Sequence, residues 1–273
     1  MRNLKIGLVG CGAIGTMIAR DLDRKGGGVV IAGLYDKDKS RARVLRGLLP
    51  HKPPLVSLAA LIRGSEVVVE CAAQSAVPEV LSAFLRSRSR NKPELIVLSV
   101  GAILKHARLV DQAREKGVRF RVPSGAVAGL DGLKGAGQGK IDRVTLTSAK
   151  PPLSFAGAPY LSERGVDLAA IKKRTVIFEG TALEAVAAFP ANINVAATLS
   201  LAGIGPEKTK VRIIADPALF VNVHEVTVEG EFGRMVCRTE NLPSAFNPKT
   251  SALAGYSALA LIRGMVAELR VGT

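Results

Sequence analysis

The sequence predicts an α/β protein with a doubly wound parallel sheet, followed by a second α+β domain with a mostly antiparallel or mixed sheet. Three observations predict this. Short apolar runs alternate with longer amphipathic runs over the first 125 residues, a glycine-rich turn follows the first apolar run, and longer alternating stretches begin at residue 141. Strands and helices that alternate over short connections are typical of a parallel sheet covered on both faces.

The elements of the first part follow from local patterns. Residues 4–9 are apolar and run into glycines, which indicates a buried strand, and residues 13–24 carry apolar side chains at helical spacing. Gly117 ends the last helix of this part. The expected strands are 4–9, 29–35, 67–71, 95–99 and 118–122, and the expected helices are 13–24, 37–48, 77–84 and 106–116.

The second part begins with a glycine-rich stretch, 124–133, that leads into a helix. Alternating apolar and polar residues then predict strands with one exposed face. The expected strands are 143–148, 211–215, 223–228 and 235–239, with helices over 182–189 and 194–201. We therefore expect a dinucleotide-binding domain over 1–124, a catalytic and dimerisation domain over 125–249, and a C-terminal helix within 250–273 that packs back on the first domain.

Composition narrows the class of protein. The chain has 273 residues, 48% of them hydrophobic and 22% charged, which is typical of a globular protein. No apolar run reaches 18 residues, so no membrane partner is expected. The three cysteines, Cys11, Cys71 and Cys237, form no pair or cluster. We expect reduced thiols, no metal site and a cytoplasmic location.

The chain is strongly basic, with a formal net charge of +15. The densest basic stretch, 86–92, contains no aromatic residue, and aromatics make up only 4% of the chain. Bases of single-stranded nucleic acid need aromatic platforms to stack on. We therefore expect a solvated basic surface and no nucleic-acid partner.

The turn after the first strand, Gly10-Cys11-Gly12-Ala13-Ile14-Gly15, matches the dinucleotide-binding fingerprint. It follows a strand, opens a helix, and has Asp36 at the end of the second strand, 21 residues after Gly15. This is the context that a Rossmann-type cofactor site requires. The expected cofactor contacts here are Gly10, Gly12, Ala13, Ile14, Gly15 and Asp36.

Asp36 favours NAD, because its carboxylate accepts hydrogen bonds from ribose hydroxyls and repels a 2′-phosphate. The neighbouring Lys37, Lys39 and Arg41 would tolerate that phosphate, so NADP also stays open. Ligands of this fold bind beyond the carboxyl ends of the strands. The small residues expected there, beside the nicotinamide and its ribose, are Ala73, Gln74, Ser99, Gly101 and Ala126.

Three histidines are the candidates for acid–base chemistry. His51 lies in a proline-rich loop and His106 begins a basic helix, so both are expected to be solvated. His224, at a strand start in the second part, remains either a structural residue or a catalytic one. Glu225 is a candidate to orient it, although neighbours on a strand point to opposite faces.

Two polar clusters flank helices of the second part. Asn192 and Asn194 either cap the following helix or hold a carboxamide or carboxylate. The other cluster is Asn247-Pro248-Lys249-Thr250-Ser251. In it Lys249 is a candidate carboxylate anchor, and Thr250 is a helix cap or a substrate contact.

Several motifs, in order over nearly the whole chain, resemble the L-aspartate dehydrogenase family. They are the 10–15 fingerprint, Ala73-Gln74-Ser75, the stretches 98–102 and 124–126, Val176-Ile177-Phe178-Glu179-Gly180, the stretch 189–200, His224-Glu225 with 230–233, and Asn247-Pro248-Lys249-Thr250-Ser251. The resemblance implies reversible, NAD(P)-dependent oxidative deamination of L-aspartate to iminoaspartate, or to oxaloacetate and ammonia.

The resemblance also implies residue roles. His224 would be the catalytic residue, Ala126 and Asn192 would contact NAD, and Asn194 is a further candidate. A homodimer formed through the second-domain sheet is implied, as is a role in NAD biosynthesis through the supply of iminoaspartate.

The segment 149–172 looks longer than the corresponding connection of the family, so we expect a lid or a surface insertion there. Two alternatives stay open. One is a related two-domain dehydrogenase of the homoserine dehydrogenase or dihydrodipicolinate reductase type. The other is a regulatory protein that senses NAD.

Overall fold

The computed structural model describes residues 3–88, 92–190, 193–244 and 247–272, without the side chains of residues 243–250. The chain divides into two compact units. Unit 1 consists of residues 1–123 and 255–270, and unit 2 consists of residues 124–254 and 271–273.

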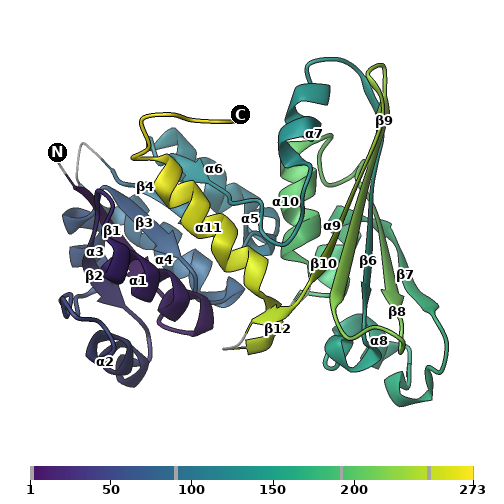
Figure 1. Ribbon diagram of the computed structural model, residues 1–273, viewed down its shortest axis with the longest axis horizontal. Coiled ribbons are helices and arrows are strands. Elements are labelled where there is room, and N and C mark those ends of the chain that lie inside the picture. Colours follow the sequence, from purple (N-terminus) through teal and green to yellow (C-terminus); the bar gives the residue numbers. More distant parts are fainter. Residues whose placement is uncertain (1–2, 89–91, 191–192, 245–246, 273) are drawn as a thin grey trace. The chain divides into compact units, whose positions relative to one another are not determined.

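Unit 1 contains a parallel sheet, drawn in purple to blue in Figure 1. Within the described residues its strands run in the order β2-β1-β3-β4-β5, and every neighbouring pair is parallel. The strands are β1 (Leu4–Val9), β2 (Val29–Tyr35), β3 (Val67–Glu70), β4 (Glu94–Val97) and β5 (Phe120–Arg121). All four residues of β3 are buried, as expected for a strand covered on both faces.

The helices of unit 1 cover both faces of this sheet. On one face α1, α2 and α11 share a core with the strands, and Ile18, Leu45 and Ile262 are fully buried in it. The helix α4 packs against α3 and against α6, and α3 packs on β1 and β2. The bounds are α1 (Ala13–Lys25), α2 (Lys39–Gly47), α3 (Leu58–Gly64), η1 (Gln74–Ala76), α4 (Val77–Arg86), α5 (Gly101–Lys105), α6 (Ala107–Glu115) and α11 (Ala252–Gly264).

Unit 2 contains a mixed sheet with the order β10-β9-β6-β8-β7 among the described residues. The β6–β8 pair is parallel and the other pairs are antiparallel, so the predicted fold class is confirmed for both sheets. The strands are β6 (Ile141–Lys150), β7 (Thr175–Thr181), β8 (Lys210–Ala215), β9 (Asn222–Gly230) and β10 (Gly233–Asn241), with the separate pair β11 (Pro243–Ser244) and β12 (Asn247–Ser251).

The helices of unit 2 are α7 (Leu130–Ala136), η2 (Pro152–Phe155), α8 (Pro159–Glu163), η3 (Leu168–Ala170), α9 (Ala182–Ala188) and α10 (Asn194–Ala202). The segment 149–172 packs into this unit, because Phe155 and Leu161 are buried and the Tyr160 ring contacts the rings of Phe178 and Phe189. Its apolar side chains thus belong to the core of unit 2.

The structure differs from the sequence expectations in several elements. The strands β7, β11 and β12 and the short helices α3, α5 and α8 were not predicted. The strand β5 covers only Phe120–Arg121 of the expected 118–122, and the last helix begins at Ala252, inside the expected 250–273. The reason for the last difference is that Asn247–Ser251 pairs with β11 as an extended strand.

Positive charge is concentrated in unit 1, which holds 24 of the 38 Lys and Arg residues but only 11 of the 23 Asp and Glu residues. The structure has Cys11, Cys71 and Cys237 as free thiols. None of the described helices combines the length and apolar character that crossing a bilayer requires.

Candidate active site

The turn between β1 and α1 leaves space where an anion would bind. Gly10 has a φ of +101°, and a Cβ there would lie 2.7 Å from the backbone nitrogen of Ala72. A Cβ at Gly15 would lie 2.0 Å from the carbonyl oxygen of Gly10, so α1 can approach the turn only because Gly15 has no side chain. A Cβ at Gly12, in contrast, would meet no heavy atom within 4 Å.

The first turn of α1 also carries no side chain that would take the place of a bound anion. Its N-cap, Gly12, makes no side-chain hydrogen bond, and the first turn contains no acidic residue. The free N–H groups at Ala13 and Ile14 and the helix dipole therefore suit a diphosphate.

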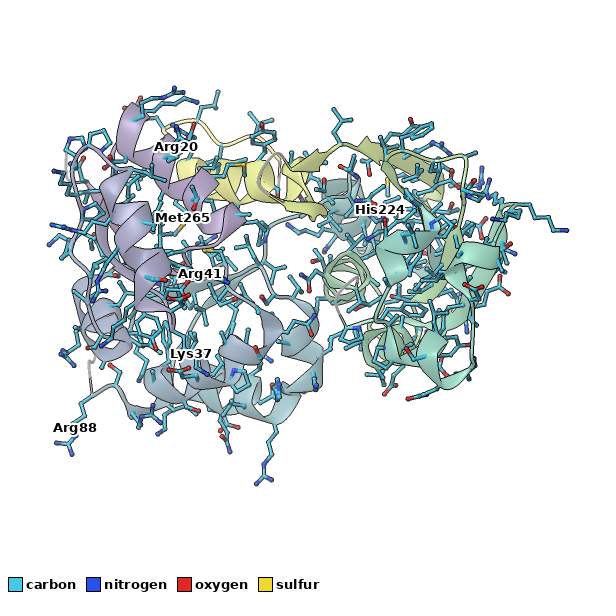
Figure 2. The ribbon with its side chains drawn as sticks, turned by 90° about the horizontal axis from the view of Figure 1, so that it is seen from below. Arg20, Lys37, Arg41, Arg88, His224 and Met265 are labelled. Carbon is cyan, nitrogen blue, oxygen red and sulfur yellow. The ribbon has the colours of Figure 1, made fainter. Side chains whose placement is uncertain are left out.

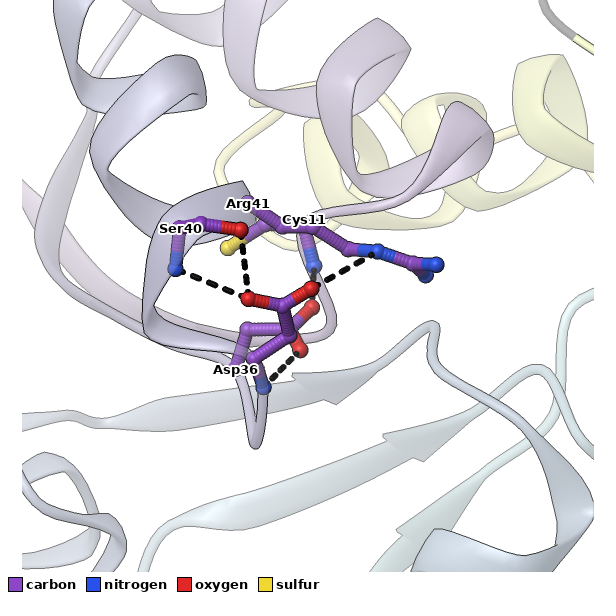
Figure 3. A network of polar contacts seen from close by, with 5 residues as sticks. Cys11, Asp36, Ser40 and Arg41 are labelled. Atoms are coloured by element: carbon purple, nitrogen blue, oxygen red, sulfur yellow. Dashed lines mark hydrogen bonds and ion pairs between the residues drawn. The ribbon is translucent and has the colours of Figure 1, made fainter.

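Asp36, at the end of β2, is held in place by the backbone. One carboxylate oxygen accepts a hydrogen bond from the Cys11 N–H at 2.7 Å, and the other accepts one from the Asp38 N–H at 2.8 Å (Figure 3). Arg41 lies 3.5 Å from the Asp38 carboxylate, which also accepts hydrogen bonds from Ser40. The guanidinium of Arg41 is therefore engaged by Asp38.

A cavity of about 160 Å³ lies at the carboxyl ends of β1, β2 and β3. Asp36, Lys37, Tyr35 and Glu79 line it, and the Tyr35 hydroxyl donates to Glu79 at 3.0 Å. The remaining lining residues are Val9, Gly10, Ala72, Ser75, Ala76 and Val80. Ala73 and Gln74 lie between the lining residues Ala72 and Ser75 in the sequence, but they do not line the cavity themselves.

Glu70 is a fully buried carboxylate beneath the cofactor loops. It accepts hydrogen bonds from the Ala72 N–H at 2.9 Å, the Ser99 N–H at 3.0 Å and the Ser99 hydroxyl at 2.9 Å. Burial raises the pKa of Glu70, and these hydrogen bonds oppose that effect. One side chain thus links the loop after β3 to the loop after β4.

The loop after β4 differs from its expectation. Ser99 is buried and its hydroxyl is used by Glu70, and Gly101 is the first residue of the short helix α5 instead of a loop residue. The stretch 98–102 therefore offers a cofactor its backbone more than its side chains.

In unit 2, His224 on β9, labelled in Figure 2, is the middle residue of a polar row across three strands. It pairs in register with Ser148 on β6 and with Thr239 on β10, so the three side chains share one face of the sheet. The Ser148 hydroxyl lies 3.0 Å from the His224 Nδ1, and both residues are buried. Glu225 lies on the opposite face, 3.9 Å from Arg238, so the residue that orients His224 is Ser148 and not Glu225.

The His224 imidazole is neutral over the usual pH range. Burial and the charge of Lys150 lower its pKa to about 3. Lys150 is two residues beyond Ser148 on β6, on the same face, and burial lowers its pKa to about 8. An unprotonated imidazole can accept a proton from an amine or a water molecule, and negative charge near Lys150 would offset the ammonium that disfavours the imidazolium.

The turn that contains Ala126 is attached to the same sheet. The Ala126 carbonyl oxygen accepts hydrogen bonds from the Thr239 hydroxyl and from the Asn241 Nδ2, both at 2.9 Å. Asn241 also donates to Thr239 at 3.1 Å. Because Thr239 pairs with His224, the predicted cofactor contact and the imidazole have a common support.

The remaining predicted residues are placed as follows. Asn192 lies outside the described residues, and so do the side chains of Lys249 and Thr250 in β12. Asn194 is exposed and is the first residue of α10, whose N-cap is Ile193 without a side-chain hydrogen bond, so Asn194 does not cap that helix.

Sequence reasoning missed Glu70, Ser148, Lys150, Thr239 and Asn241. A signal existed for Glu70, which ends an otherwise all-valine strand. For the other four the signal was weaker: each is a polar residue on the apolar phase of an alternating strand. Among the described residues no group of three or more His, Cys, Asp or Glu could hold a metal ion.

The chain is similar to known proteins over nearly its whole length. Residues 131–265 match the family model for the C-terminal part of aspartate dehydrogenase, and residues 10–123 match the model for the NAD-binding domain of homoserine dehydrogenase. The L-aspartate dehydrogenases of Methanosarcina acetivorans and Methanococcoides burtonii are each 47% identical to the chain, over 99% of it and 100% of their own lengths. The chain belongs to the L-aspartate dehydrogenase family.

A solved relative supports the same conclusion. The crystal structure of aspartate dehydrogenase from Thermotoga maritima matches with a TM-score of 0.70 at 28% identity, over 99% of this chain and 100% of that one. As a member of the L-aspartate dehydrogenase family, the chain is an NAD(P)-dependent oxidoreductase of the class that acts on CH–NH₂ groups. This confirms the resemblance, the enzyme class and the cofactor class expected from the sequence.

Proposed function

We propose that this protein catalyses the reversible oxidative deamination of L-aspartate. A hydride leaves C2 of L-aspartate for the nicotinamide, the amine loses a proton, and iminoaspartate forms. Water then adds to the imine and ammonia leaves, which gives oxaloacetate. The observation that carries the proposal is the buried, neutral His224, which contacts Ser148 on the sheet that also holds the Ala126 turn.

We assign proton transfer to His224. When Nδ1–H donates to the Ser148 oxygen, Nε2 keeps its lone pair and accepts a proton from the substrate ammonium or from the attacking water. The two carboxylates of the substrate raise the pKa of His224 when they bind nearby, because negative charge favours the imidazolium. The site therefore becomes a stronger base when it is loaded.

NAD, when bound, supplies the hydride acceptor. We assign its diphosphate to the first turn of α1 at Gly12, Ala13 and Ile14, and its adenosine ribose to Asp36. We further assign the nicotinamide end to the loops that Glu70 links. Contacts of Ala126 and Asn192 with NAD remain what the family resemblance implies. NAD is the preferred cofactor in this proposal, because Asp36 is fixed and Arg41 is engaged by Asp38.

Three wider parts of the proposal rest on the family. They are a homodimer formed through the sheet of unit 2, a cytoplasmic location, and a supply of iminoaspartate for NAD biosynthesis. The strand faces opposite His224 carry the half-buried Thr145, Thr147 and Thr227, which suits a surface that another chain covers. Light scattering of the purified protein measures the oligomeric state, and a monomer would contradict the homodimer.

The test of the activity is absorbance at the reduced-nicotinamide band with L-aspartate, compared for NAD and NADP. L-Homoserine and other amino acids serve as competing substrates, and no turnover of L-aspartate would refute the proposal. His224→Ala is expected to lose turnover and to keep NADH binding. His51→Ala is the matched control, because the His51 side chain is 79% exposed and pairs only with Asp23 among the described residues.

A further inference from the structure

Lys150 is a buried cation in the His224 row. It is 6% exposed, whereas every other Lys or Arg side chain described between residues 124 and 254 is exposed. Lysine is among the residues least often buried, because the ammonium group loses its hydration. A lysine kept at such a position indicates that its charge has a use.

The position of Lys150 relates that charge to the chemistry. Val144, Leu146, Ser148 and Lys150 form the buried phase of β6, and Ser148 contacts His224 directly. Lys150 is near enough to His224 for its charge to disfavour the imidazolium. The Lys150 ammonium and the His224 imidazole therefore lie near each other on one face of the sheet.

A substrate that reaches His224 through its amino group carries carboxylates close by. Every α-amino acid has one carboxylate bonded to the reacting carbon, and aspartate has a second one carbon further away. We propose that the Lys150 ammonium binds a carboxylate of the substrate and is a specificity-determining residue of this site. This inference rests on the proposed function and names a carboxylate anchor besides Lys249, whose side chain lies outside the described residues.

The test compares wild type with Lys150→Met, which keeps the length of the side chain and removes its charge. A charge-assisted hydrogen bond in a buried site corresponds to an affinity loss of about 10- to 100-fold. We expect KM for L-aspartate to rise by that factor, with a smaller change in kcat. Direct titration with succinate in the presence of NADH should show the same loss of affinity.

Lys210→Met is the matched control, since Lys210 is an exposed lysine on the neighbouring β8. Thermal unfolding checks the fold of both variants; Lys150→Gln, which removes the charge and keeps a hydrogen-bond donor, takes the place of Lys150→Met if that variant unfolds, and the same losses are expected. L-2-Aminobutyrate, which lacks the second carboxylate, tells which carboxylate is bound: an effect on aspartate alone indicates the side-chain carboxylate, and an equal effect on both indicates the α-carboxylate.

The two proposals fail in different ways. If wild type does not oxidise L-aspartate, the proposed function is wrong. If wild type oxidises it and a folded Lys150→Met keeps both the KM for L-aspartate and the affinity for succinate, the role of Lys150 is wrong and the proposed function stands.

Discussion

The attachment of the Ala126 turn to β10 allows a quantitative test by a double-mutant cycle. The Ala126 carbonyl oxygen accepts two hydrogen bonds, from Thr239 and from Asn241, and Asn241 also donates to Thr239. Thr239→Val keeps the shape of the side chain and removes its hydroxyl. Ala126 then still has Asn241, so we expect a loss of only about 0.5–1.5 kcal/mol in the free energy of unfolding.

Asn241→Leu removes the other donor, and the loss is expected to be similar. The double variant leaves the buried Ala126 carbonyl with neither side-chain partner, and an unsatisfied buried group costs about 1–3 kcal/mol more. The effects should therefore be more than additive, with a coupling energy of about 1 kcal/mol.

Urea unfolding gives the free energies, and fluorescence titration gives the affinity for NADH. Affinity should fall by about tenfold in the double variant, since the turn that the family resemblance implies for the cofactor loses its anchor. Thr227→Val is the control, because Thr227 is a threonine of the same sheet on the opposite face. Purely additive losses with unchanged NADH affinity would show that the turn is held by something else.

Three further predictions follow from the buried polar groups. Glu70→Gln places an amide nitrogen against the N–H of either Ala72 or Ser99, so NADH should bind about tenfold more weakly, and unchanged binding in titration would contradict the link. Ser148→Ala should lower kcat by about 5- to 50-fold with little change in KM, because His224 loses its hydrogen-bond partner. Ser148→Thr keeps a hydroxyl and should retain part of the wild-type kcat. Equal kcat in wild type and both variants would show that Ser148 does not position His224. The pKa of His224 in the folded chain is about 3, against an ordinary value of 6.5. Between these values the unfolded chain binds more protons than the folded one, so the free energy of unfolding should fall as pH drops below 6.5, by up to about 1.4 kcal/mol per pH unit relative to His224→Gln. Urea unfolding measures this difference, and the same pH dependence of the free energy in both proteins would refute the low pKa.

The first sheet was predictable because its inner strands, β1, β3 and β4, are largely buried on both faces. β1 and β2 begin and end where the apolar runs do, since solvent-exposed residues cannot continue such a strand. The helices α3 and α5 were missed because seven and five residues are too few to show a helical period. β7 was missed because only Phe178 in it is buried, so its residues show no clear alternation.

The candidate site was predictable where its residues lie close together in the sequence. The glycines at 10, 12 and 15 and Asp36 lie within one βαβ unit, so their spacing carries the information. Ser148 and His224 are 76 residues apart, and Thr239 and Ala126 are 113 apart. Pairing register alone brings such residues together, and register depends on the packing of the whole sheet.

The uneven charge of the two units bears on which form of the coenzyme arrives first. Unit 1 contains most of the excess of Lys and Arg over Asp and Glu, and it also contains the diphosphate turn. NADH is more negative than NAD⁺, because its ring has lost the positive charge of the pyridinium. Long-range attraction of a basic surface for an anion speeds diffusional encounter and weakens as salt is added. Low ionic strength should thus raise the association rate constant of NADH more than that of NAD⁺. NADH is the coenzyme that amination uses, so low salt favours the first binding step of amination over that of deamination.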